Sequence, residues 1–138
     1  MKKYRLALCL LLCTSLMASC LTINAAEQAS DYINEYTIEV TPMGDGDIAI
    51  DFSVTGTDVM TKLGAECITV YYRSGIRWVF AGEYTREESG MYGSNRTEFS
   101  NTICFHGTEG TYYKIQVEVF AEDTTGSDSA FQTFYVTA

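Results

Sequence analysis

The sequence predicts an all-β domain of seven short antiparallel strands, a sandwich or a small barrel, behind an N-terminal export signal. The clearest evidence is the segment Tyr113–Ala121, where apolar side chains at every second position alternate with Lys114, Gln116 and Glu118. That period of two is typical of a strand with one buried face and one solvated face. Similar short segments recur along the chain between turn-forming residues, and no stretch has the pattern of an amphipathic helix.

The expected strands are separated by runs that contain Gly, Pro, Ser or Asp. In chain order they cover residues 36–41, 48–54, 66–73, 77–84, 99–105, 112–121 and 131–136.

Two of the connections are expected to be irregular. Residues 57–64 predict a single helical turn, because Met60 and Leu63 are three residues apart and Gly64 can end it. Residues 85–98 predict one long loop, since this stretch combines glycine, serine, asparagine and charged residues.

The first 26 residues are expected to be a signal peptide, with a basic segment at 1–5 and an apolar run at 6–17 that is too short to span a membrane. Ordinary cleavage after residue 25 or 26 leaves one secreted domain over residues 27–138. The alternative is a cut before Cys20, because the preceding residues look like a lipobox. Lipidated Cys20 would then tether the domain to a membrane.

The charge of the exported domain is strongly negative. All eighteen acidic residues but only six of the nine basic residues follow the signal, which gives a net charge of −12. Such a surface repels phosphate backbones and anionic lipid headgroups, so we expect neither binding to nucleic acid nor insertion of the mature domain into a membrane. Its simplest role is to keep an exported domain dispersed.

Cys67 and Cys104 remain after ordinary cleavage, and a pair of cysteines in an exported chain is a candidate disulfide. The alternation argues against the bridge, because it turns both side chains outward on opposite sheets. A disulfide needs Cα atoms about 4.4–6.8 Å apart. A disulfide between Cys67 and Cys104 therefore remains an alternative only if their two strands are neighbours in the fold.

The sequence contains no motif of a catalytic, metal or cofactor site. His106 is the single histidine and lies beside a turn, where a solvated role is the ordinary one. Asp45, Asp47 and Asp51 form the densest group of carboxylates, but Gly-Asp-Gly-Asp is also turn chemistry and the twelve-residue calcium loop is missing. We therefore expect no catalytic residue, no metal and no cofactor.

Binding is the more plausible activity. Strict alternation would put Trp78, Phe80 and Tyr84 on one face of their strand. If exposed, they could stack on sugar rings or contact a protein, and if buried they belong to the core. Met91 and Tyr92 in the 85–98 stretch are further candidates, although they can equally fold back over an edge of the sandwich.

The order of strands resembles the fibronectin type III and immunoglobulin-like sandwich over residues 33–136. The segment Tyr113–Ala121 and the turn at Gly126 are similar to the F strand and F–G hairpin of those domains. The resemblance implies a tyrosine corner, in which the Tyr113 hydroxyl group bonds to the backbone near residues 108–110. The usual early-strand tryptophan is absent, since Trp78 comes after the third strand.

The chain is also similar, nearly end to end, to a family of small exported bacterial proteins. The resemblance rests on Asp31-Tyr32-Ile33, Phe52-Ser53-Val54-Thr55-Gly56-Thr57, Gly64-Ala65, Gly90-Met91-Tyr92-Gly93 and Tyr112-Tyr113. That family implies export and the fold but supplies no activity.

The expected function is therefore non-catalytic binding of an extracellular protein or glycan. The alternative is a structural or assembly role in which an edge strand pairs with another chain. An enzyme that uses paired carboxylates ranks last.

Overall fold

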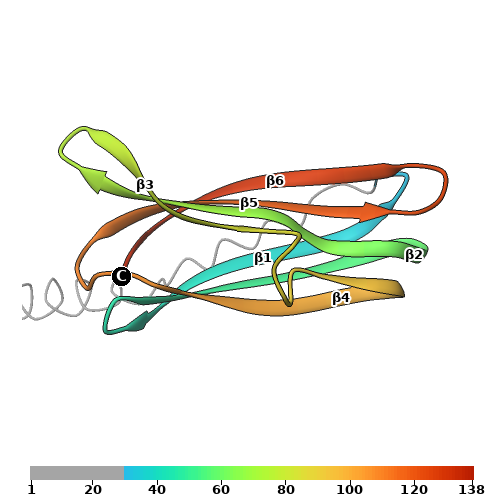
Figure 1. Cartoon of the computed structure of the whole chain (residues 1–138), viewed down its shortest axis with the longest axis horizontal. Coiled ribbons are helices and arrows are strands. Elements are labelled where there is room, and N and C mark those ends of the chain that lie inside the picture. The colour runs from blue at the N-terminus through green and yellow to red at the C-terminus, as the bar shows by residue number, and fades with distance from the viewer. Residues whose placement is uncertain (1–29) are drawn as a thin grey trace, which may run out of the picture.

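A computed structural model describes residues 30–138 of the chain (Figure 1). Its elements are β1 (Ile33–Gly44), β2 (Asp47–Ser74), β3 (Arg77–Thr85), β4 (Tyr92–His106), β5 (Tyr112–Glu122) and β6 (Ser127–Thr137). Every pairing is antiparallel, and no helix occurs among the described residues. The all-β antiparallel prediction is confirmed. The expected signal peptide, its cleavage sites and Cys20 lie outside the described residues.

The long strand β2 connects the two halves of the fold. Its first part, residues 47–56, lies between β1 and β4. Its second part still pairs with β4 over residues 60–64, and it pairs with β5 over residues 62–72 and with β3 over residues 67–74, while β5 in turn pairs with β6. The sheet therefore curls, so that β1 and β4 lie in one layer and β3, β5 and β6 in the other (Figure 1).

The helical turn predicted for residues 57–64 is wrong. Residues 30–138 form six strands where seven are expected, because β2 runs through this region. Met60 and Leu63 are both buried although they are three residues apart. The register with β4 does not shift between Met60 and Leu63, so the two side chains point to opposite faces of β2. Both faces of the strand are therefore covered at this point, and the three-residue spacing does not come from a helical turn.

Gly64 lets β4 approach this part of β2 closely. A Cβ atom there would lie 2.3 Å from the Met91 carbonyl oxygen and 2.6 Å from the Tyr92 Cα atom, and the Gly64 φ angle is +155°. Glycine is the residue that permits both the backbone angle and the contact.

The loop between β3 and β4 is shorter than predicted, because β4 already begins at Tyr92. The connecting residues are also fastened to the sheet. Met91 is fully buried, and its carbonyl oxygen accepts a hydrogen bond of 2.7 Å from the Ala65 amide. Arg86 forms an ion pair with Glu122, with 2.9 Å between Nη1 and Oε2. This segment is therefore part of the fold and not a free recognition loop.

The core lies between the two layers and is built from the alternate apolar residues of β1, β2 and β5. Tyr113 lies at one end of this core and is 4% exposed. Its hydroxyl oxygen accepts a hydrogen bond of 2.8 Å from the Thr108 amide, which is the contact expected of this tyrosine. Gly107 leaves room for the ring, because a Cβ atom there would lie 2.7 Å from the hydroxyl oxygen.

Candidate binding surface

The outer face of the layer formed by β3, β2, β5 and β6 carries a row of large side chains. Tyr71 on β2 is paired with Phe80 on β3 and with Lys114 on β5, and Lys114 is paired with Tyr135 on β6. Paired residues in an antiparallel sheet point to the same face. These four side chains therefore cross all four strands in one row, and the Tyr71 and Phe80 rings meet edge to face at 6.2 Å between centroids.

Trp78 is the centre of this surface. It is paired with Arg73, two residues along each strand from the pair of Tyr71 and Phe80, and so points to the same face. The centroid of the Trp78 ring lies 5.7 Å from the centroid of Tyr112 and 5.7 Å from that of Tyr135. Aromatic rings at these distances attract each other beyond the gain from buried area. Residues 71, 73, 78, 80, 112, 114 and 135 together are called the aromatic face below.

Two cations lie over the rings of the aromatic face. The Arg73 guanidinium carbon is 5.2 Å from the centroid of the Trp78 ring, and Arg73 Nε donates a hydrogen bond of 2.7 Å to the Gly75 carbonyl oxygen. Lys114 Nζ is 5.5 Å from the Trp78 centroid and 4.3 Å from that of Tyr71. Cations within about 6 Å of a ring face are attracted by its electron-rich surface.

These cations stand out in an acidic chain. Arg73, Arg77 at the tip of the β2–β3 hairpin, and Lys114 are three of the six basic residues that follow the expected signal. Within residues 30–138, none of the three forms an ion pair, whereas Lys62 and Arg86 both pair with Glu122.

The predicted alignment of Trp78, Phe80 and Tyr84 is wrong for Tyr84. Ala81 is an extra residue in β3, because Val70 is paired with Gly82 while Tyr71 is paired with Phe80. This bulge reverses the faces beyond it. Trp78 and Phe80 point outward, and Phe80 is 59% exposed.

Tyr84 lies opposite the fully buried Ile68 and packs against the core. Its hydroxyl group donates a hydrogen bond of 3.3 Å to the Cys104 carbonyl oxygen. Burial raises the pKa of the Tyr84 phenol above its ordinary value. Tyr84 is therefore a structural residue and not part of the binding surface.

The second pair of candidates does not form a surface either. Met91 is fully buried and cannot contact a ligand. Tyr92 is half-buried, its ring lies 6.4 Å from that of Phe120, and Lys62 Nζ lies 5.5 Å from the Tyr92 centroid. Both residues close the junction between β4 and β2.

Tyr112 and Tyr135 were not among the sequence candidates. The signal for Tyr112 is its two-residue spacing from Lys114, which places both on the solvated face of the central strand. Tyr135 is found only through the register, because its place beside Trp78 depends on how β6 pairs with β5.

The opposite outer face, on β1, β2 and β4, has a different character. It carries a depression of about 540 Å³ whose lining includes Glu39, Asp51 and Thr102. Thr102 Oγ1 donates a hydrogen bond to Asp51 Oδ1. This face is therefore polar and acidic at the depression, in contrast to the aromatic face on the other layer.

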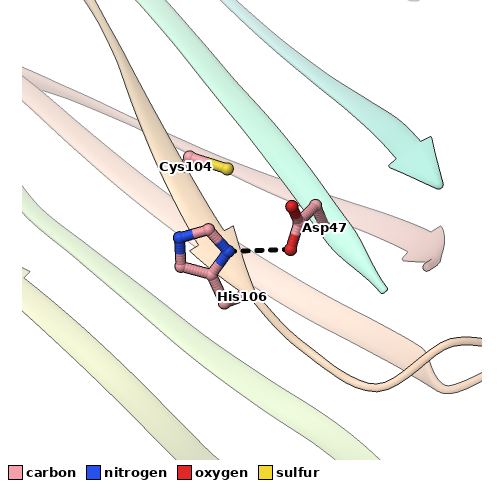
Figure 2. A group of neighbouring side chains, drawn as sticks. All are labelled: Asp47, Cys104 and His106. Atoms are coloured by element: carbon pink, nitrogen blue, oxygen red, sulfur yellow. Dashed lines mark hydrogen bonds and ion pairs between the residues drawn. The ribbon is translucent and has the colours of Figure 1, made fainter. Parts of the chain in front are cut away.

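Cys67 and Cys104 are both free, so the candidate disulfide between them is not formed in this structure. Cys67 is half-buried on β2, and burial raises the pKa of its thiol. Cys104 is exposed on β4 and lies close to Asp47 and His106 (Figure 2).

Fold and surface together define an all-β domain with an exposed aromatic and cationic face. Within residues 30–138, no helix has the length and hydropathy to cross a membrane. Comparison with known proteins found no family model, no curated protein and no solved structure that matches this chain.

Proposed function

We propose that the protein is an exported, non-catalytic binding module that recognises an acidic protein partner through the aromatic face. The observation that carries the proposal is the setting of Trp78, which lies between Tyr112 and Tyr135 with the cations of Arg73 and Lys114 against its ring. Tryptophan, tyrosine and arginine are the residues that most often dominate binding energy in protein interfaces.

The ring geometry favours a protein over a glycan. A platform for sugar rings presents flat aromatic faces to solvent. Here the Trp78 ring is tilted by 42° to Tyr112 and by 46° to Tyr135, which are 25° from parallel to each other, and Arg73 and Lys114 lie over the Trp78 ring. The surface combines aromatic rings, hydroxyl groups and cations, which suit the mixed polar and apolar surface of a protein.

The charge distribution favours an acidic partner. The exported chain carries a net charge of −12, yet the cations of the aromatic face have no carboxylate partner among the described residues. A partner with aspartate or glutamate residues would pair with them and be steered to this side of the molecule.

The fold assignment belongs to the same proposal. We take the two parts of β2 as separate strands of a seven-stranded sandwich similar to fibronectin type III and immunoglobulin-like domains. The pairing of residues 47–56 with β1, and of residues 62–74 with β5 and β3, supports this assignment, while β4 pairs with both parts of β2. The hydrogen bond between the Thr108 amide and the Tyr113 hydroxyl group supports it as a tyrosine corner.

Export is tested by the intact mass of the mature protein from its native host. A chain that begins near residue 26 or 27 supports free secretion, whereas a chain that begins at an acylated Cys20 is a membrane-tethered lipoprotein. A full-length chain would contradict export in either form.

Recognition is tested by probing the mature protein against an array of peptides of graded acidity and an array of neutral and acidic glycans. The key variant is Tyr135→Ala. Its matched control is Phe131→Ala, because both aromatic residues lie on the outer face of β6 and both are 56% exposed. Of these two residues, only Tyr135 has its ring against the Trp78 ring.

The proposal predicts that acidic peptides bind the wild type and Phe131→Ala alike, and that Tyr135→Ala binds about tenfold or more weakly. Equal binding by both variants would place the contact elsewhere. Binding on the glycan array without any bound peptide would overturn the choice of a protein partner.

A further inference from the structure

We propose that Asp47, Cys104 and His106 form a Zn²⁺ site on the outer face of the β2–β4 pair. The site lies on the opposite layer from the aromatic face and does not depend on the proposed binding function. Its evidence is the convergence of three different ligand types at one point of the sheet (Figure 2).

The register of the sheet brings these residues together. Asp47 at the start of β2 is paired with His106 at the end of β4, and Ala49 is paired with Cys104. Cys104 and His106 are two residues apart on one strand, so both point to the face that Asp47 shares. One ligand atom of each residue lies within 4.8 Å of the other two.

The backbone on both sides of the site is fixed. Gly46 precedes Asp47 and Gly107 follows His106, and the Gly107 amide donates a hydrogen bond of 3.0 Å to the Gly46 carbonyl oxygen. The side chains are also partly arranged, because His106 Nδ1 and Asp47 Oδ1 are 2.8 Å apart. A scaffold of this kind lowers the entropic cost of ordering the three ligands when a metal binds.

The distances suit zinc after small side-chain rotations. Zinc binds sulfur at about 2.3 Å and nitrogen or oxygen at about 2.0–2.2 Å, so two tetrahedral ligands lie about 3.5 Å apart. Separations near the upper limit of 4.8 Å therefore need to close by about 1 Å, and the 2.8 Å contact between His106 Nδ1 and Asp47 Oδ1 needs to open by about 0.7 Å. Exposed side chains can make this adjustment, and the side chains of His106 and Asp47 are 77% and 38% exposed.

The donor set selects the metal class. A thiolate and an imidazole are preferred by zinc, whereas calcium and magnesium take oxygen ligands. Three protein ligands leave one tetrahedral position for water. The open position is accessible to water because the ligands lie on the outer face of the β2–β4 pair, where His106 is exposed.

The test is titration of the reduced mature protein with Co²⁺, a spectroscopic substitute for zinc, followed by displacement with Zn²⁺. The decisive variant is Cys104→Ser. Its matched control is Cys67→Ser, which removes the other free thiol of the described chain. Circular dichroism verifies that each variant is folded.

The proposal predicts one bound Co²⁺ per chain with a thiolate-to-cobalt absorption band. The band persists in Cys67→Ser and disappears in Cys104→Ser, and His106→Ala binds at least about tenfold more weakly. Zn²⁺ abolishes the band and protects Cys104, but not Cys67, from alkylation. A wild-type protein without the band, or a band that survives Cys104→Ser and is lost in Cys67→Ser, would overturn the site.

Discussion

Replacing Met91 by alanine tests whether the segment between β3 and β4 belongs to the core or is available for recognition. Met91 is fully buried within the core cluster. Truncating a buried methionine removes its transfer free energy and leaves a cavity, which together cost about 2–5 kcal/mol. A domain of this size has a free energy of unfolding of about 5–15 kcal/mol. The substitution therefore removes a large part of the stability.

Met43→Ala is the matched control, because Met43 is 65% exposed near the end of β1. The same chemical change at that position is expected to alter the free energy of unfolding by about 0.5 kcal/mol or less. The comparison therefore isolates the effect of burial from that of removing a methionine.

The assay is equilibrium unfolding in urea with a reductant present, followed by circular dichroism and by the fluorescence of Trp78, the single tryptophan. With a urea slope of about 1–3 kcal/mol/M, a loss of about 3 kcal/mol lowers the midpoint by about 1–3 M. If Met91→Ala costs no more than Met43→Ala, the segment is not packed as described, and Met91 returns as a candidate ligand contact.

Two further predictions concern hydrogen bonds at opposite ends of β5. Tyr113→Phe removes the hydroxyl oxygen that accepts a hydrogen bond from the Thr108 amide, and it should lower the free energy of unfolding in urea by about 1 kcal/mol. Tyr112→Phe, at an exposed site, should lower it by about 0.5 kcal/mol or less. Equal losses would argue against the tyrosine corner. The Thr125 hydroxyl and amide groups donate hydrogen bonds to Asp123 and lower its carboxyl pKa below the ordinary value. The stabilising contribution of the Asp123 carboxylate is thus present above its unfolded-state pKa and is lost as the pH falls through its folded-state pKa. NMR titration should find this lowered pKa and a higher one in Thr125→Val, and an ordinary value in the wild type would contradict the hairpin geometry.

The sequence predicts the parts of the fold where one strand alternates without interruption. β5 is expected at residues 112–121 and found at Tyr112–Glu122, because its inward residues are all apolar and its first outward ones are polar. The region around residues 57–64 could not be interpreted in this way. Met60 and Leu63 lie on a strand that is covered on both faces there, and a three-residue spacing in isolation is the same for such a strand and for a helical turn.

The candidate surface was only partly predictable for the same reason. Trp78 and Phe80 follow from alternation, but Tyr84 does not, because the extra residue Ala81 changes the face. Tyr135 joins Trp78 through the pairing of β6 with β5, which depends on contacts distant in sequence, whereas Arg73 faces Trp78 across the short β2–β3 hairpin. The convergence of Asp47 with His106 likewise needs the register of β2 and β4, and their sequence separation gives no hint of it.

The most direct test of the proposed function is the fluorescence of Trp78 while a labelled acidic peptide from the array is titrated onto the mature protein. Trp78 is the single tryptophan and lies at the centre of the aromatic face, so its emission reports on that surface alone. We predict a saturable change with the same midpoint as the anisotropy of the peptide, and weaker binding as salt rises from about 0.05 to 0.5 M. Saturable binding by anisotropy with unchanged Trp78 emission, and with equal affinity for Tyr135→Ala, would contradict it.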